Sequence, residues 1–325
     1  MYFKFIDLCA GIGGFRFALE KFGGKCVLSS EIDDKTNSLY GLIHKDSNVQ
    51  KDLFDININT VETFDVLCAG FPCQPFSSSG KQGGFKDPRG NVFFGILKFI
   101  KEKKPKIIFL ENVKNLLSHD TGKTLNTIVN LLIEEGYSVT YEVLNNKNFD
   151  SPQNRERLYI IGTKGKPFSF SNLKKASQSN CLKKFISKER EYIEGDYTII
   201  PKTHWKKQKS GLQFVGFFNK NLRKVDNQNI NPYLSRYHKQ PNRIYHIDGV
   251  HPTLSAQESS GRYFLYDDIG VFKVPPRDLL ALQGFPSEIA GYIETTSHLN
   301  RVIGNAVNPN VISRIFSELV LQDIL

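Results

Sequence analysis

Residues 3–15 run Phe-Lys-Phe-Ile-Asp-Leu-Cys-Ala-Gly-Ile-Gly-Gly-Phe, an apolar stretch that ends in a cluster of glycines. A short apolar run bounded by turn residues is typical of a buried parallel strand, so we expect a strand at Phe3–Leu8. The glycines allow a tight turn and close approach of the backbone to a ligand, with a helix from Gly14. The turn suits a nucleotide-like cofactor. Arg16 occupies the third glycine position of G-x-G-x-x-G, which disfavours a nicotinamide oxidoreductase.

The first 163 residues continue to alternate strand-like and helix-like segments. We expect strands at Phe3–Leu8, Cys26–Ser30, Phe64–Ala69, Lys106–Leu110, Ser138–Val143 and Leu158–Gly162. We expect helices at Gly14–Phe22, Asp34–His44, Asn91–Glu102 and Lys123–Glu135. This alternation predicts the α/β class, with a mostly parallel, doubly wound sheet that carries helices on both faces.

The character of the sequence changes near Lys164, where Lys, Asn, Gln and Ser replace the β–α rhythm. We divide the chain into a catalytic and cofactor domain, a smaller basic domain and a connector, at residues 1–170 (completed by a C-terminal helix at about 300–325), 171–275 and 276–299. Two further helices are expected at 278–283 and Val307–Leu321, the second packed back on the first sheet.

Composition limits the class of protein. The chain has 325 residues, 40% of them hydrophobic, and can bury a real core. It has no apolar run long enough for a membrane span and its first residues lack a signal-peptide layout, so we expect a soluble, cytoplasmic protein with no membrane partner. Its five scattered cysteines contain no Cys-x-x-Cys pair, which argues against disulfides and a zinc site. We expect no metal.

The net charge of +10 is concentrated in one segment. Residues 164–249 hold 18 Lys/Arg and 6 Asp/Glu, a net charge of +12, whereas residues 1–163 have a net charge of +1 and residues 250–325 a net charge of −3. A segregated basic block points to a polyanionic partner. Nucleic acid is the first candidate, because phosphate neutralisation supplies most non-specific affinity.

A candidate nucleophile lies in residues 70–77, Gly-Phe-Pro-Cys-Gln-Pro-Phe-Ser. This loop places Cys73 just past the strand expected at Phe64–Ala69, where open α/β sheets bind ligands. Cysteine reaches the nucleophilic thiolate form most easily near neutral pH. Cys68, inside the strand, suits a buried core position instead.

Two further groups are expected at the same edge of the sheet. Glu111 follows the apolar strand Lys106–Leu110, and partial burial would raise its pKa and make it a proton donor. On extended backbone Gln153, Arg155 and Arg157 share one face, and paired guanidiniums suit a phosphate or a nucleobase carbonyl.

A thiol, an acid and a guanidinium opposite a cofactor turn suit electrophilic substitution at a deactivated ring carbon. C5 of a pyrimidine is a poor nucleophile until a thiolate adds at C6. An acid at N3 stabilises that adduct, and a cation can steady the exocyclic O2. The target base must first leave the duplex stack.

Two acidic residues support a nucleotide-like cofactor. Glu31 ends the second expected strand, where a carboxylate can accept both hydroxyls of a ribose. Asp52 follows residues 49–51, at the expected end of a third strand, and can accept from an adenine amino group.

These motifs resemble, in order and spacing and over nearly the full length, those of the DNA (cytosine-5) methyltransferases of bacterial restriction–modification systems. The stretches that carry the resemblance are Asp7–Phe15, Gly70–Gln74, Glu111–Val113, Gln153–Arg157, Arg277–Pro286 and Gly304–Val307. The resemblance implies an S-adenosylmethionine-dependent methyltransferase fold and a smaller target-recognition domain facing the major groove. It implies methyl transfer from S-adenosyl-L-methionine to C5 of a flipped-out cytosine in a short specific duplex, with S-adenosyl-L-homocysteine as product.

The resemblance also assigns roles by position. Cys73 would attack C6, Glu111 would engage N3, and Arg155 and Arg157 would hold the base and the loop. The cofactor-binding positions are Gly11, Gly13, Phe15, Glu31, Ile32, Asp52, Pro72 and Asn305. The DNA-binding positions are Gln74 beside the nucleophile, Ser77, Lys81 and Arg89 in the loop of about Ser77–Asn91 that would close over the DNA, and Gln240 and Arg243 in the recognition segment.

The sequence departs from the family at Cys9 and Ile32, where relatives commonly carry aromatic residues that line the cofactor; this bears on cofactor affinity rather than on the reaction. Two alternatives stay open: a methyltransferase of the related transfer-RNA type, and a catalytically silent DNA-binding relative. The chain lacks the Cys-Phe-Thr tripeptide of the first, and all candidate catalytic residues are present, which disfavours the second. We expect double-stranded DNA as partner, a cognate restriction endonuclease acting on the same site, and a monomer.

Overall fold

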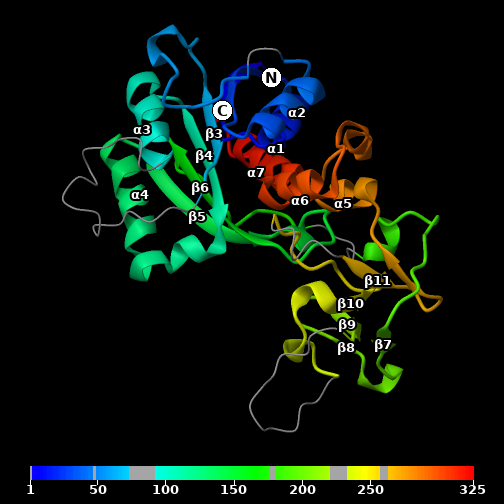
Figure 1. The fold of residues 1–325 in the computed structure, drawn as a ribbon. Helices are drawn as coiled ribbons and strands as arrows, with labels where there is room; N and C mark the ends of the chain where they lie inside the picture. The colour runs from blue at the N-terminus through cyan, green and yellow to red at the C-terminus, as the bar shows by residue number, and fades with distance from the viewer. Residues whose placement is uncertain (1, 47–48, 73–91, 176–180, 220–232, 257–262) are drawn as a thin grey trace, which may run out of the picture. The chain divides into compact units, whose positions relative to one another are not determined.

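The computed structural model describes residues 2–46, 49–72, 92–175, 181–219, 233–256 and 263–325. The chain forms two compact units (Figure 1). The first unit comprises Met1–Asn145, Glu156–Lys175 and Ala306–Leu325, and the second unit comprises Asn146–Arg155 and Ala176–Asn305.

The first unit is built on a six-stranded sheet of order β2-β1-β3-β4-β6-β5. Its strands are β1 (Phe3–Leu8), β2 (Gly24–Ser30), β3 (Val66–Gly70), β4 (Ile107–Val113), β5 (Ser138–Asn145) and β6 (Glu156–Thr163). Strands β1 to β4 pair in parallel, whereas β6 runs antiparallel to both β4 and β5. The connection from β5 to β6 is too short to hold a crossover helix, so these two strands pair antiparallel. The predicted α/β class with a mostly parallel sheet is confirmed.

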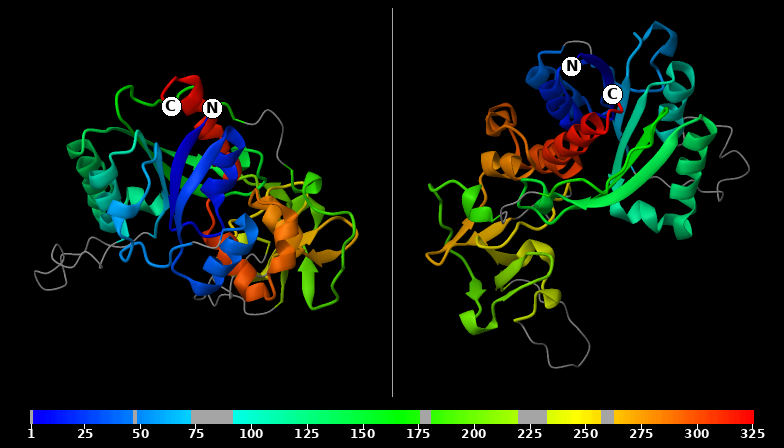
Figure 2. Two further views of the ribbon diagram at one scale, coloured as in Figure 1. Left: turned by 90° about the horizontal axis from the view of Figure 1, so that it is seen from above. Right: turned by 180° about the vertical axis from the view of Figure 1, so that it is seen from behind.

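Helices cover both faces of this sheet (Figure 2). On one face α3 (Val92–Lys103) and α4 (Lys123–Glu134) pack on β1, β3 and β4 in one apolar core. The buried side chains of α4 include Leu125, Ile128 and Leu132, the spacing of a helix with one apolar face. The other face carries α1 (Gly14–Leu19), α2 (Asp34–His44) and α7 (Pro309–Leu321).

The C-terminal helix returns to the first strand, as predicted. The ring of Phe316 in α7 stacks on that of Phe3 in β1, with 5.0 Å between their centroids. The helix begins at Pro309, two residues later than expected, because Asn308 caps it by accepting from the backbone N–H groups of Asn310 and Val311.

The second unit contains another sheet, of order β12-β11-β10-β9-β7, with β8 paired to β9. Its strands are β7 (Tyr197–Ile199), β8 (Lys206–Lys207), β9 (Gln213–Phe218), β10 (Arg243–His246), β11 (Phe264–Tyr266) and β12 (Val271–Lys273). The helices α5 (Pro276–Leu282) and α6 (Thr296–Asn305) follow. None of these strands was predicted from the sequence. Four of them, β7, β8, β11 and β12, have only two or three residues, too few to show an alternating pattern.

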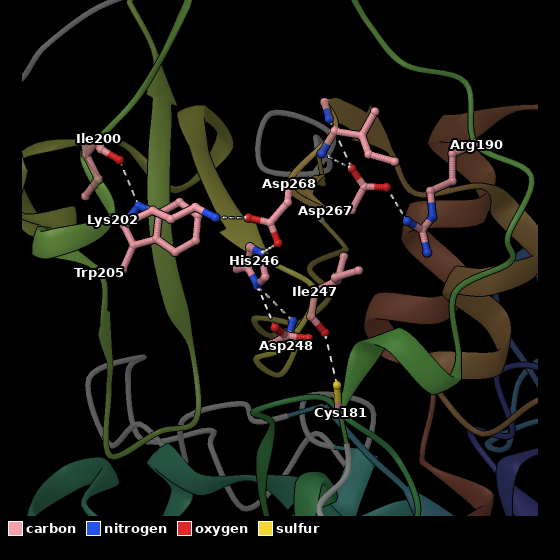
Figure 3. Close-up of polar contacts among 12 residues, drawn as sticks. Cys181, Arg190, Ile200, Lys202, Trp205, His246, Ile247, Asp248, Asp267 and Asp268 are labelled. Carbon is pink, nitrogen blue, oxygen red and sulfur yellow. Dashed lines mark hydrogen bonds and ion pairs between the residues drawn. The ribbon is translucent and has the colours of Figure 1, made fainter.

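Polar contacts stabilise this second sheet (Figure 3). Asp267 pairs with Arg190 and accepts hydrogen bonds from the Tyr192 hydroxyl at 2.8 Å and from the Gly270 N–H at 3.1 Å. Burial raises the pKa of Asp267, but these donors outweigh burial and the net shift is downward. The carboxylate therefore stays ionised at neutral pH.

Among the helices that the structure describes, none combines the length and the apolar character needed to cross a bilayer.

Gly14 shows how tightly α1 packs. A Cβ added at this position would lie 2.2 Å from the Val307 carbonyl oxygen. We expect Gly14→Ala to destabilise the protein by about 1–3 kcal/mol through overpacking, measured as the free energy of unfolding in urea. Gly291→Ala is the matched control, because no atom lies within 4 Å of the added Cβ. Equal stability of the two variants would contradict the packing argument.

Candidate active site

The register of three strands brings candidate residues to one edge of the first sheet. β3 and β4 run in parallel with Gly70 opposite Glu111. β6 runs antiparallel to β4 with Arg157 opposite Val113. The ends of β3 and β4 and the start of β6 therefore lie together, at the edge where open α/β sheets bind ligands.

Glu111 and Arg157 form an ion pair at this edge. The Arg157 Nε lies 3.2 Å from the Glu111 Oε1, and the two side chains are 14% and 9% exposed. Because so little water reaches the pair, its electrostatic interactions are stronger than those of a surface ion pair. The structure thus joins two of the predicted catalytic residues.

Asn112 holds the backbone that leads toward the predicted nucleophile. Its side chain is buried, and its Nδ2 donates to the carbonyl oxygen of Phe71 at 2.9 Å. Cys73 itself lies outside the described residues, as do Gln74, Ser77, Lys81 and Arg89. Sequence reasoning gave Asn112 no role, although it stands in the motif Glu111–Val113.

Arg155 has other partners. Its guanidinium donates to the carbonyl oxygens of Leu254 at 3.1 Å and Gly304 at 2.8 Å, within the second unit. Gln153 binds the same residue, since its Oε1 accepts from the Leu254 N–H at 3.1 Å. Gln153 and Arg155 thus both bind Leu254, whereas Arg157 pairs with Glu111.

The cofactor turn is held by Glu31, directly after β2. Its carboxylate accepts from the backbone N–H of Gly11 at 2.9 Å and from that of Asp33 at 2.9 Å. Burial raises the pKa of Glu31, and these two N–H donors oppose the rise. The Glu31 carboxylate therefore orients the turn at Gly11, and its remaining lone pairs can accept hydrogen bonds from further donors.

The other cofactor candidates differ in exposure. Ile32 is 65% exposed, whereas Phe15 is 1% exposed and packs edge-on against Phe109. Asp52 is half-buried and accepts from the Phe54 N–H at 2.9 Å. The remaining candidates are Pro72, which is exposed, and Asn305, the exposed last residue of α6 in the second unit.

His44 contacts the glycine turn at Ile12 and Gly13, a role that the sequence analysis did not predict. Its Nε2 lies 3.3 Å from the Ile12 carbonyl oxygen, and a Cβ on Gly13, whose φ is +84°, would lie 2.2 Å from that nitrogen. Burial and the nearby Arg16 charge lower the pKa of His44 to about 4. The neutral ring therefore donates to Ile12. Histidine in a helix carries no sequence signal for such a contact.

The geometry of the turn fits a nucleoside cofactor. Gly11 has a φ of +58°, and a Cβ built there would have no atom within 4 Å, so the backbone faces open space. The acids Glu31 and Asp52 and the exposed Ile32 offer acceptors for hydroxyls and an amino group beside an apolar surface. Within the described ranges, no three His, Cys, Asp or Glu side chains come together as a possible metal site.

The predicted recognition residues lie in the second unit. Gln240 begins the short 3-10 helix η9 (Gln240–Asn242). Arg243 donates from Nε and Nη2 to the His238 carbonyl oxygen at 3.0 and 2.8 Å. The buried His238 ring stacks on Phe217, with 4.0 Å between centroids, so the start of this segment is packed on β9.

A mostly parallel sheet with a glycine turn after β1 and an acid after β2 is consistent with the fold of S-adenosylmethionine-dependent methyltransferases. Residues 3–321 match the C-5 cytosine-specific DNA methylase family, and the chain belongs to this family. It is therefore a DNA (cytosine-5) methyltransferase, and S-adenosylmethionine is the methyl donor that this family implies.

Named relatives cover nearly the whole chain. It is 34% identical over 322 residues to the Type II methyltransferase M.HhaI of Haemophilus parahaemolyticus, covering 96% of this chain and 92% of that protein. It is 35% identical over 322 residues to the Type II methyltransferase M.HaeII of Haemophilus aegyptius, covering 98% and 93%. A crystal structure of the S. pombe Dnmt2 methyltransferase matches with a TM-score of 0.70 over 99% of both chains, at 18% identity, and supports the fold alone.

Asn112→Ala removes the donor to Phe71. We expect a loss of about 1–3 kcal/mol in the free energy of unfolding, because a buried carbonyl loses its partner. We expect the single-turnover methylation rate to fall about tenfold or more, since the backbone leading to Cys73 is no longer held. Asn115→Ala, at an exposed position three residues on, is the control. Unchanged methylation in Asn112→Ala would show that this hydrogen bond does not support the site.

Proposed function

We propose that this methyltransferase acts on a flipped-out cytosine within a short specific duplex sequence, with Cys73 as its nucleophile. The observation that carries the proposal is the Glu111–Arg157 ion pair, at the sheet edge where Gly70 stands opposite Glu111. Gly70 is followed three residues later by Cys73. A proton donor, a fixed cation and a thiol beside one pyrimidine are the groups that activation of C5 needs.

In the proposed mechanism the Cys73 thiolate forms a bond to C6, and the C5–C6 double bond supplies the electron pair that makes C5 nucleophilic. When the base occupies the site, the Arg157 guanidinium donates to O2 instead of pairing with Glu111. Glu111 is then protonated and donates to N3, so charge on the ring is neutralised as it develops. After C5 is methylated, water takes the C5 proton, the electron pair of that C–H bond restores the C5–C6 double bond, and the C6–S bond breaks so that Cys73 leaves as thiolate. N3 then returns its proton to Glu111, which restores the acid for the next cycle. The base must be out of the stack for these contacts to form.

S-adenosylmethionine supplies the electrophilic methyl group. We propose that Glu31 accepts its ribose hydroxyls and Asp52 its adenine amino group, and that Gly11 and Gly13 let the backbone approach it. Phe15, Ile32, Pro72 and Asn305 complete the proposed cofactor residues. The Glu31 carboxylate that already accepts from Gly11 supports this assignment, because the same group fixes the turn and binds the cofactor.

We propose that residues 171–275 are the target-recognition domain and read duplex DNA in the major groove, and that 276–299 connect it to the catalytic domain of 1–170 and about 300–325. The concentration of positive charge in residues 164–249 supports this, because it matches the charge of a phosphate backbone. Gln240 and Arg243 are the proposed base-contacting residues. Gln74, Ser77, Lys81 and Arg89 are proposed to contact the DNA around the flipped cytosine.

We propose that the enzyme is the modification partner of a restriction endonuclease with the same target site. The relatives named Type II methyltransferases support this context. We further propose that it works as a monomer in the cytoplasm without a metal ion, since the reaction modifies one strand at a time, and that it releases S-adenosyl-L-homocysteine.

Replacing Cys73 tests the nucleophile. We expect Cys73→Ser to abolish methylation while duplex binding remains measurable by mobility shift, because the hydroxyl is a far weaker nucleophile than a thiolate. Bisulfite sequencing of DNA from cells expressing each form is the measurement. The wild type is expected to protect one short sequence that the variant leaves unprotected. Wild-type protection by Cys73→Ser would exclude the mechanism.

Trapping tests the covalent step and the acid together. A duplex with 5-fluorocytosine at the target position is expected to give a complex that survives denaturing electrophoresis, because fluorine at C5 cannot leave as a proton. Glu111→Gln keeps the size of the side chain but cannot supply the proton, and is expected to slow trapping by about 10²- to 10⁴-fold. Absence of a wild-type adduct with cofactor present would count against the proposed chemistry.

A further inference from the structure

Arg155 stands where the chain passes between its two units. The chain makes this passage four times, after Asn145, Arg155, Lys175 and Asn305. Arg155 is the last residue before one passage, and its contacts reach residues that border two of the others.

Three hydrogen bonds connect Arg155 to other residues of the second unit. Its backbone carbonyl accepts from the N–H of Asn146, the first residue after one passage, at 3.0 Å. Its Nη2 donates to the carbonyl oxygen of Gly304, the penultimate residue before another, at 2.8 Å. One buried residue, 2% exposed, therefore ties together three of the four points of passage.

The second acceptor of the guanidinium, the Leu254 carbonyl, is itself held in place. The Leu254 N–H donates to Gln153 Oε1 at 3.1 Å, while its carbonyl accepts from Arg155 Nη1 at 3.1 Å. The Asn154 N–H donates to the His251 carbonyl at 2.7 Å, and the Thr253 hydroxyl donates to the Asn154 carbonyl at 2.7 Å. Residues 251–254 are thus bound along their length and form a fixed support.

Arginine suits this position for a geometric reason. Its planar guanidinium presents donors in a rigid fork, so two carbonyls from distant parts of the chain fix its orientation. A lysine ammonium would keep the charge but would not impose one plane on two acceptors. The contacts of Arg155 thereby fix the backbone directly before β6, which begins at Glu156, one residue before Arg157.

We propose that Arg155 is a positioning residue that acts through Arg157, rather than a second group on the base. It holds the origin of β6 and the end of α6, so that the guanidinium of Arg157 meets Glu111 in one orientation. This inference rests on the proposed function, because it requires that Arg157 serve the reaction.

A double-mutant cycle tests the proposal with Arg155→Lys, Arg157→Lys and the combination. We expect Arg155→Lys to lower the single-turnover methylation rate by about tenfold to a hundredfold, the range that a misplaced group costs. If Arg155 acts through Arg157, the double variant methylates within about twofold of Arg157→Lys alone. Dissociation constants for duplex DNA and S-adenosyl-L-homocysteine, measured by titration, are expected to stay within about twofold of wild type in Arg155→Lys.

Arg190→Lys is the matched control, since Arg190 is another arginine of the second unit, with its side chain 13% exposed, and it pairs with Asp267 (Figure 3). It is expected to lower the thermal midpoint of unfolding without slowing methylation. If Arg155→Lys does not yield folded protein, Arg155→Gln, which keeps one amide donor, enters the same cycle.

The proposal would be overturned if the methylation rate of the double variant fell by the product of the losses in the two single variants. It would also be overturned if Arg190→Lys lost as much rate as Arg155→Lys. Failure of the proposed function can be told apart from failure of the positioning role, because the wild type would then form no adduct with 5-fluorocytosine. A wild-type adduct with independent effects of the two arginines would leave the reaction intact and remove only the positioning role.

Discussion

The position of β4, between a parallel and an antiparallel neighbour, is the constraint on which the rest of the site depends. Parallel pairing with β3 places Glu111 opposite Gly70, and antiparallel pairing with β6 brings Arg157 to the same edge. A slip of one residue in either register would turn the side chains to the other face of the sheet. Since β4 is buried over Ile107–Asn112 in the apolar core, that slip would also place polar groups in the core, so packing fixes the chemistry.

The carboxylates of Glu31 and Glu111 contact donors of different charge. Glu31 is bound by backbone N–H groups of Gly11 and Asp33, which hold it in place without adding a charge. Glu111 faces the charged Arg157. A neutral environment suits an acid that binds hydroxyls, whereas a neighbouring cation suits a site where charge develops during a reaction. The part of the sheet edge at Glu31 is thereby suited to binding, and the part at Glu111 to chemistry.

Much of the first unit could be predicted because its strands are apolar runs and its helices have one apolar face. The segments at Phe3–Leu8 and Asp34–His44 were predicted to the residue. The second unit was predicted only as a basic region, because strands as short as Lys206–Lys207 carry no periodic signal. At the site, position in the sheet pointed to Glu111, but the contacts of Asn112 and His44 depend on residues distant in the sequence. Such contacts follow from packing and leave no local pattern.

Arg155 and Arg157 bind different partners and lie on either side of the residue at which β6 begins. Two arginines with one residue between them share a face only if the backbone is extended through both. Here Arg157 lies within β6, whereas Arg155 precedes its first residue, Glu156. The two arginines of one motif can then serve different ends: the guanidinium of Arg157 meets a carboxylate at the sheet edge, and that of Arg155 binds the carbonyls of Leu254 and Gly304. The motif Gln153–Arg157 thus holds two guanidiniums with separate contacts, one on each side of Glu156, the first residue of β6.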